Sequence, residues 1–344
     1  MTNWDKKQRL EAVFAGEPAD RPPVSAWRHF IDREQEAGAL AEAMIEFQTE
    51  FDWDFVKINP RATYYAEIWG NTYDFGNYEG MVPKVKTFTI HDSADLEHIK
   101  ERGMDCSPLQ EQLEAIRLTR EGLGKDIPIM QTLFSPLTVL EYLCGNRTLA
   151  SNRPAIRSAS PLPALMANYP EQVHRALQQI SLTLGNYVQE AQKVGADGFF
   201  YSVMGLARDG YLTVEEYDKF ARPYDLQVLE ASNPASVILH TCGPDAHPER
   251  FVHYPISAIH WADRSEGSTS LADSSQWIGN KVAMGGVDET LFVSDNKEEV
   301  TSQGLHAIDA MRNRPFILAP GCGLPLNANQ SAVKALRSVV EEIE

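Results

Sequence analysis

Short apolar runs recur along this chain of 344 residues, and amphipathic stretches separate several of them. The runs are rich in apolar and β-branched residues and are mostly bounded by Gly, Pro or Asp, as expected of strands buried on both faces of a parallel sheet. Eight such runs occupy residues 22–27, 54–59, 127–133, 198–203, 236–242, 258–262, 281–287 and 315–319. Eight strands alternating with helices predict an α/β fold of the closed (β/α)₈ or TIM-barrel type. The alternative is an open doubly wound sheet, but no Gly-x-Gly-x-x-Gly follows the first run.

Amphipathic stretches between and after these runs are the predicted helices. In the first of them, Ala176, Ile180 and Leu184 lie on one stripe. The predicted helices occupy residues 171–194, 214–232, 297–312 and 328–342. No low-complexity linker or internal repeat divides the chain, so we expect one domain spanning residues 1–344, with an N-terminal extension before the first strand.

One segment interrupts the alternation of strands and helices. Residues 60–126 separate the second and third predicted strands and are too long for an ordinary helical crossover. The segment contains an aromatic stretch from Tyr64 to Phe75 and an alternating stretch from Lys84 to Ile90, which is typical of a hairpin strand. Long ordered insertions near a barrel mouth often shape the substrate site. The alternative is a folded surface excursion with no part in catalysis.

Two cysteines and one histidine stand at or just after the ends of two predicted strands. His240 and Cys242 belong to Val237-Ile-Leu-His-Thr-Cys-Gly, and Cys322 belongs to Ala319-Pro-Gly-Cys-Gly. Side chains two residues apart on a strand point to the same side, so His240 and Cys242 can reach one point in space. Cys322 can join them from another strand end. Three protein ligands with a fourth position open are the usual arrangement of catalytic zinc.

The alternative interpretation of each of these residues is structural. A buried free cysteine usually behaves as a small hydrophobic residue, and a lone buried histidine is usually hydrogen-bonded within the core. The combination is harder to explain by packing, because glycines beside both cysteines let the backbone approach closely. Cys106 and Cys144 lack such a setting and are interpreted as structural.

The ligand types indicate the chemistry of the predicted zinc site. Two thiolates and a neutral imidazole leave zinc with little or no net positive charge, so it is a mild Lewis acid. Such a centre still holds an incoming thiol as its thiolate at neutral pH. Hydrolytic zinc sites are more often built from histidine and carboxylate. The pair of cysteines therefore favours alkylation of sulfur over hydrolysis.

Composition excludes several classes of partner. A formal net charge of −17 argues against nucleic acid and anionic membrane surfaces, which both require a basic face. No apolar run is long enough to span a bilayer, and the first ten residues lack the apolar segment of a signal peptide. Four cysteines without clustered spacing favour a reducing compartment, so we expect a cytoplasmic protein.

Polar residues stand at nearly every predicted strand end. In a TIM barrel these ends form the functional face. The residues there are Arg28, His29, Asn59, Ser135, Ser202, His240, Cys242, Asp263, Asp288 and Cys322. Asp263 is a candidate fourth zinc ligand or hydrogen-bond partner of His240, and a solvated turn is its alternative. Asp288 is a candidate substrate contact, with capping of the following helix as the alternative.

Several motifs, in this order and spacing, make nearly the whole chain resemble the uroporphyrinogen decarboxylase superfamily. They are Gly16-Glu-Pro-Ala-Asp-Arg-Pro-Pro-Val, Ser135-Pro-Leu-Thr-Val-Leu-Glu-Tyr, Gly195-Ala-Asp-Gly-Phe-Phe-Tyr-Ser, Leu239-His-Thr-Cys-Gly, Gly285-Gly-Val-Asp and Pro320-Gly-Cys-Gly. The resemblance implies a (β/α)₈ barrel. It also makes Arg28, Tyr142 and Ser202 candidate contacts for a polar or anionic substrate.

The chain departs from true decarboxylases at positions that matter for their chemistry. Decarboxylases carry a histidine where this chain has Cys322, and only Arg28 is in register with their Arg-Gln-Ala-Gly-Arg segment. Their carboxylate after the second strand has no counterpart near Asn59. Decarboxylation of uroporphyrinogen is therefore a minor alternative.

The His-x-Cys and Gly-Cys-Gly motifs are similar to the zinc-binding set of the methylcobalamin:coenzyme M methyltransferase branch. The resemblance implies that His240, Cys242 and Cys322 bind zinc and that a thiol or tetrahydrofolate exchanges a methyl group with a methylcobamide. The cobamide would be free or carried by a separate corrinoid protein, since the chain has no evident corrinoid domain. A methyl transfer like that of cobalamin-independent methionine synthase is the runner-up, and a non-catalytic ligand-binding barrel is a further alternative.

Overall fold

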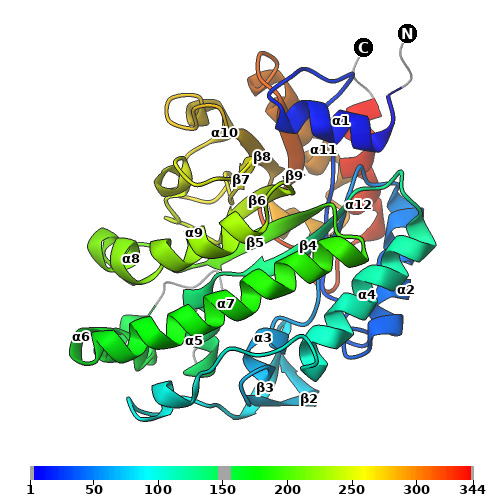
Figure 1. The fold of residues 1–344 in the computed structure, drawn as a ribbon. Helices are drawn as coiled ribbons and strands as arrows, with labels where there is room; N and C mark the ends of the chain where they lie inside the picture. Colours follow the sequence, from blue (N-terminus) through cyan, green and yellow to red (C-terminus); the bar gives the residue numbers. More distant parts are fainter. Residues whose placement is uncertain (1–3, 146–155, 342–344) are drawn as a thin grey trace.

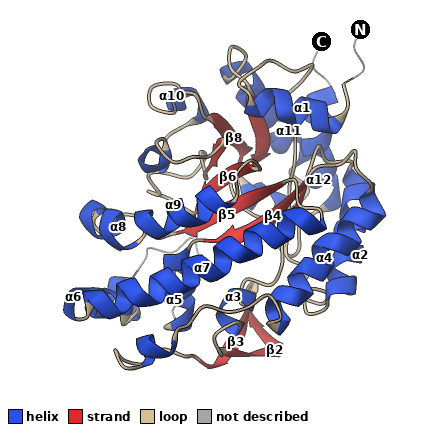
Figure 2. Ribbon diagram, viewed as in Figure 1, coloured by secondary structure: helices blue, strands red, loops and turns tan. Residues whose placement is uncertain are grey.

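Seven parallel strands form one curled sheet, and helices surround it (Figures 1 and 2). The computed structural model describes residues 4–145 and 156–341. In spatial order the strands are β1 (Val56–Ile58), β4 (Ile129–Phe134), β5 (Gly198–Met204), β6 (Ser236–Thr241), β7 (Ala258–His260), β8 (Val282–Val287) and β9 (Phe316–Pro320). Spatial order follows chain order, as expected of a TIM barrel.

The first predicted strand, at residues 22–27, is reduced to a single bridge between Val24 and Leu318. Pro23 O accepts from Leu318 N over 2.8 Å, and Val24 O accepts from Asp54 N over 3.0 Å. This extended segment therefore lies between β9 and the chain just before β1, in the eighth position of the barrel. It does not become a regular strand because Pro22 and Pro23 have no amide hydrogen to donate.

The predicted helices are present, with one break. The helices are α1 (Lys6–Phe14), α2 (Ala37–Phe51), α3 (Tyr64–Glu67), α4 (Ser107–Leu123), α5 (Pro136–Leu143), α6 (Leu162–Asn168), α7 (Pro170–Val194), α8 (Val214–Phe220), α9 (Arg222–Ala231), α10 (Leu271–Ser274), α11 (Lys297–Ala310) and α12 (Gln330–Ser338). The stretch 214–232, predicted as one helix, divides into α8 and α9 because Pro223 cannot continue the hydrogen-bond ladder. The stretch 328–342 becomes α12 and the short helix η6 (Val339–Glu341), and residue 342 lies outside the described residues.

The long insertion after β1 is partly an ordinary crossover. Its last part is α4, which packs beside α2 and α7 and returns the chain to β4. The earlier part carries α3 and the antiparallel hairpin of β2 (Thr72–Glu79) and β3 (Val82–Thr87). The hairpin lies at the end of the molecule opposite α1 (Figure 1), and its turn lines one cavity with residues at the carboxyl ends of β4, β5 and β6.

Two buried clusters separate the inside of the barrel from its outer shell. Inward-facing residues, among them Phe200, Ile238 and Met284, form the inner cluster. Leu10 and Val13 of α1 belong to the same cluster. The N-terminal extension therefore closes the amino-terminal end of the barrel with apolar side chains. The larger outer cluster fills the space between strands and helices.

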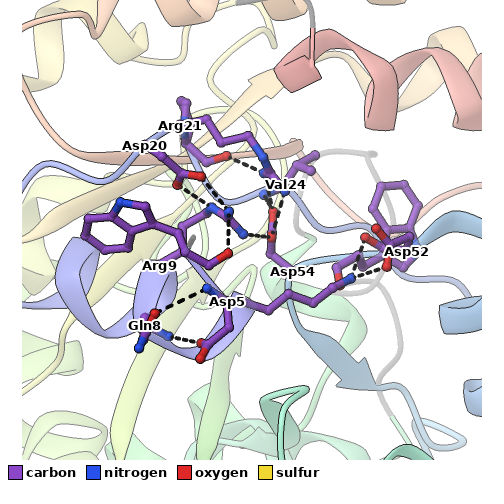
Figure 3. Close-up of polar contacts among 12 residues, drawn as sticks. Asp5, Gln8, Arg9, Asp20, Arg21, Val24, Asp52 and Asp54 are labelled. Carbon is purple, nitrogen blue, oxygen red and sulfur yellow. Dashed lines mark hydrogen bonds and ion pairs between the residues drawn. The ribbon is translucent and has the colours of Figure 1, made fainter. Parts of the chain in front are cut away.

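A buried carboxylate at that same end ties α1 to the barrel (Figure 3). Asp54 is fully buried and accepts hydrogen bonds from Arg9 Nη1 over 2.8 Å, from Arg21 Nη1 over 2.7 Å and from the Val24 amide over 2.8 Å. Asp20 in turn holds Arg9 by two contacts of 2.7 Å. This network fixes α1 and the segment around Val24 against the start of β1.

Within the described part of the chain, every helix is too short or too polar to traverse a lipid bilayer.

Candidate metal centre

The two strand-end motifs meet inside the barrel. His240 is on β6, Cys242 follows the last residue of this strand, and Cys322 lies two residues beyond β9. One potential ligand atom from each of the three residues lies within 4.8 Å of the other two. His240 and Cys242 continue the inward face of Ile238, as the two-residue alternation of a strand requires. Cys106 and Cys144, also free thiols, are not part of this cluster.

The spacing of the two sulfur atoms fits a tetrahedral metal ion. Cys242 Sγ and Cys322 Sγ are 3.8 Å apart. Two thiolates bound to zinc at about 2.3 Å in tetrahedral geometry are also about 3.8 Å apart. The spacing and the donor types would therefore suit a zinc ion held by Cys242, Cys322 and His240.

Without a metal, the two cysteines share one proton. A hydrogen bond from the Cys322 thiol lowers the pKa of Cys242 well below its usual value, helped by His240 and Arg208 and opposed by burial. The same hydrogen bond, with burial and the negative charge of Cys242, raises the pKa of Cys322 well above its usual value. Cys242 is therefore the thiolate of the pair and Cys322 the thiol.

His260, the last residue of β7, sets the orientation of His240. Its Nε2 lies 2.8 Å from Pro320 O, a group that only accepts, so Nε2 carries the hydrogen. Burial, followed by the nearby His240, lowers the pKa of His260 well below its usual value, so His260 is neutral and its Nδ1 accepts. His240 Nδ1, 2.8 Å away, is then the donor. This arrangement leaves His240 Nε2 free to bind a metal, as is usual for metal-binding histidines.

Arg208 supports the backbone of Cys242 from the other side. Its buried guanidinium donates from Nε to Cys242 O over 2.6 Å. Gly243 adopts φ +83°, and a Cβ there would lie 2.0 Å from Arg208 Nη2. The glycine after Cys242 is therefore required both by its backbone conformation and by the close approach of Arg208.

The three candidate ligands line a cavity of about 880 Å³. Its walls are largely apolar or aromatic and include Tyr65, Phe134 and Phe200. Glu79 and Met81, at the turn of the β2–β3 hairpin, line it as well. The insertion thus contributes directly to the cavity, which supports its interpretation as a part of the substrate site.

One lysine faces this cavity from β1. Lys57 is buried, and its Nζ donates to Asn59 Oδ1 over 2.5 Å. The Nζ also lies 5.0 Å from the ring centroid of Trp27 and 4.5 Å from that of Phe200. Burial lowers the pKa of Lys57 to about 7, and negative charge on Cys322 opposes this effect.

Several other predicted site residues line the same cavity. Ser202 of β5, His29 and Asn59 were predicted from strand ends, and Tyr142 of α5 from the family resemblance. His29 Nδ1 lies 2.9 Å from a carboxylate oxygen of the fully buried Glu34. The structure therefore brings these four residues into one chamber with the metal centre.

Three other candidates lie elsewhere. Arg28 faces a separate cavity of about 180 Å³ beside α2 and α12, because its chain neighbours on either side point into the main cavity. Asp288 accepts from the Thr290 amide over 2.8 Å and caps the short helix η5 (Glu289–Val293). Asp263 is buried outside the three-residue cluster and accepts from the Gly286 amide over 2.8 Å.

Sequence reasoning missed His260, Lys57 and Arg208. The predicted strand 258–262 begins where β7 begins but extends two residues past its end, so His260 was not predicted as a strand-end residue. The parallel register that pairs His240 with His260 would have identified it. Lys57 had a local signal, a single lysine within the apolar run Phe55-Val-Lys-Ile.

The chain is similar to known proteins over most of its length. The chain is 22% identical over 341 residues to "Methylcobamide:CoM methyltransferase MtbA" of Methanosarcina mazei, covering 94% of each protein, and equally so to the protein of that name from Methanosarcina acetivorans. Among solved structures, a methyltransferase from Methanosarcina mazei superposes with a TM-score of 0.81 at 18% identity, over 99% of both chains.

A B12-independent methionine synthase from Shewanella sp. W3-18-1 shares the fold more distantly, with a TM-score of 0.59 at 12% identity, over 94% of this chain and 97% of that one. The family profile of uroporphyrinogen decarboxylase (URO-D) matches residues 5–343, which is nearly the whole chain. The protein therefore belongs to the uroporphyrinogen decarboxylase family.

Proposed function

We propose that this protein is a zinc-dependent methyltransferase that moves a methyl group between a methylcobamide and a thiol or tetrahydrofolate. The observation that carries the proposal is the His240, Cys242 and Cys322 cluster at the base of the cavity. Two sulfurs and one imidazole are the ligand set of a thiol-activating zinc site. The relatives named methylcobamide:CoM methyltransferases support a methylcobamide as the methyl donor. The methylcobamide would arrive free or on a corrinoid protein.

The residues around the cluster have distinct roles in this proposal. When bound, zinc would keep an acceptor thiol deprotonated and nucleophilic at neutral pH. His260 holds His240 in the tautomer that presents Nε2, and Arg208 holds the Cys242 backbone. The aromatic walls exclude water from the acceptor, and Tyr142 and Ser202 offer hydroxyl groups to it. The methyl group forms a bond to sulfur as the cobalt–carbon bond breaks, and that electron pair stays on cobalt.

Metal analysis is the first test of this proposal. Wild-type protein purified without added metal is expected to contain about one zinc per chain by mass spectrometry, and Cys322→Ala is expected to contain far less. Cys106→Ala is the matched control, because Cys106 is a free thiol outside the cluster. A wild type that stays free of zinc after reconstitution would remove the basis of the proposal.

A spectral assay then identifies the substrates. Demethylation of methylcobalamin changes the absorbance of the corrinoid, and it can be followed with coenzyme M, with homocysteine or with tetrahydrofolate as acceptor. Turnover with any of them that requires intact Cys322 supports the proposal. Turnover only between methyltetrahydrofolate and homocysteine, without a cobamide, would instead indicate chemistry like that of a B12-independent methionine synthase.

A further inference from the structure

Lys57 places a buried amino group on the wall of the cavity. Its amino group contacts the Asn59 side-chain oxygen and the faces of Trp27 and Phe200. Among residues 4–145 and 156–341, no carboxylate forms an ion pair with it. Burying an ammonium group without an opposite charge is costly, so this position suits a partner that supplies negative charge.

Lys57 lines the same cavity as the three candidate ligands His240, Cys242 and Cys322. Negative charge on Cys322 raises the pKa of Lys57, against the larger effect of burial. The positive charge of Lys57 contributes to the low pKa of His260, after burial and the effect of His240. The Phe200 ring lies 4.5 Å from Lys57 Nζ and 5.4 Å from the His240 ring, so it connects Lys57 to the cluster although β1 and β6 are not neighbours in the sheet.

The charge count at the centre explains what Lys57 would balance. Two cysteine thiolates offset the two positive charges of zinc, so the centre with a neutral His240 has no net charge. When an acceptor thiol binds, its S–H bond breaks, its proton leaves to solvent and its sulfur keeps the electron pair. The site then carries one extra negative charge in a buried place, which is unfavourable unless a positive charge lies nearby.

We infer that Lys57 balances the charge of the acceptor thiolate and thereby holds the acceptor in its reactive form. The inference rests on the proposed function, because it requires a thiol at the open position. It also favours a thiol over tetrahydrofolate, whose reacting nitrogen brings no negative charge. Lys57 acts as a positioning residue, through its charge and not through a bond to the reacting atoms.

Cobalt-substituted protein gives a direct test, because thiolate binding to cobalt(II) produces a charge-transfer absorption band. The probes are 2-mercaptoethanol, which has no charged tail, and 2-mercaptoethanesulfonate, which has one. Lys57→Met is expected to weaken the binding of both thiols by about tenfold or more, the order expected when one of two nearby buried charges is removed. Lys57→Arg keeps the charge and is expected to restore most of the affinity.

Two controls separate this effect from misfolding and from net charge. Cobalt content of one ion per chain in Lys57→Met shows that the site is intact. Lys281→Met removes a positive charge from a partly buried lysine that is bonded to Ile256 O and lies outside the cavity, and it is expected to leave thiol affinity unchanged.

The outcomes distinguish the inference from the proposed function. Unchanged affinity of Lys57→Met for both thiols would overturn the inference while leaving the methyltransferase proposal in place. A loss of affinity confined to 2-mercaptoethanesulfonate would also overturn the inference, because Lys57 would then bind the sulfonate tail and not the sulfur. A wild-type cobalt protein that binds neither thiol would overturn the inference together with the thiol arm of the proposed function.

Discussion

Replacement of Gly243 by alanine tests how the backbone positions the metal ligands. Gly243 follows Cys242 and has φ +83°, and an added Cβ would lie 2.0, 2.5 and 2.8 Å from Nη2, Cζ and Nε of Arg208. The guanidinium is buried, so it cannot turn into solvent to avoid the new methyl group. Either Arg208 loses its bond to Cys242 O or the Cys242 backbone moves.

The expected cost has two parts. A left-handed backbone conformation costs a non-glycine residue about 1–2 kcal/mol. Loss of a hydrogen bond from a charged donor, here the 2.6 Å bond from Arg208 Nε to Cys242 O, costs about 1.5–3 kcal/mol. Gly243→Ala should therefore lower the free energy of unfolding by about 2.5–5 kcal/mol. The displaced Cys242 should also bind zinc more weakly.

Gly16→Ala is the matched control. Gly16 has nearly the same φ, +78°, but nothing lies within 4 Å of its added Cβ, so it reports the conformational strain alone. Urea unfolding of the metal-free proteins, followed by tryptophan fluorescence, measures stability without a contribution from metal binding. Zinc per chain measures the site. If Gly243→Ala matched Gly16→Ala in both measurements, the argument that Arg208 and Gly243 together position Cys242 would be refuted.

Three further predictions concern charge and protons. Asp54→Asn should lower the free energy of unfolding by about 3–5 kcal/mol, because it removes the buried negative charge that pairs with Arg21 and, together with Asp20, with Arg9. A loss below about 1 kcal/mol in urea would contradict this role of the network. Burial raises the pKa of Asp225 to about 6 despite hydrogen bonds from three tyrosines, so the folded protein holds this proton more tightly than the unfolded chain, whose pKa is about 3.9. The resulting stabilisation is complete below about pH 4 and is lost, by on the order of 3 kcal/mol, as the pH rises through 6. Asp225→Asn should remove this dependence, and parallel stability curves for the two proteins between pH 4 and 7 would show the reasoning to be wrong. Zinc uptake by metal-free protein at pH 7 should release about one proton, from Cys322, because Cys242 is already a thiolate. A pH indicator in weak buffer measures the number of protons released. Release of two protons or of none would exclude the shared-proton arrangement.

Local patterns predicted the barrel because its strands are buried on both faces and read as continuous apolar runs. β4, β5 and β6 lie within or close to their predicted positions for that reason. The first strand was wrong as a regular element, since hydrophobicity does not report that Pro22 and Pro23 lack amide donors. The break between α8 and α9 had the same cause at Pro223. In both places a missing donor outweighed the apolar pattern.

The three ligand candidates came together because strand-end position alone determines where such side chains meet. The residues that support them were harder to predict, since their roles depend on register and on which way a side chain points. His260 is opposite His240 only through the pairing of β6 with β7. The prediction that Arg28 contacts substrate depended on the direction of its side chain. One step along an extended segment turns a side chain from the cavity to the outer face, and Arg28 lies on the outer face.

The apolar plug supplied by Leu10 and Val13 of α1 has a kinetic consequence. Because it seals the amino-terminal end of the barrel, a substrate that reaches the cluster would enter from the hairpin end, and so would the bulky cobamide of the proposed reaction. A small thiol can pass to the base of the chamber only before the larger donor covers the entrance. Methyl transfer from a methylcobamide to a thiol should thus follow a compulsory order of binding, with the acceptor first and the cobamide second. The methylated product should leave only after the demethylated cobamide has departed.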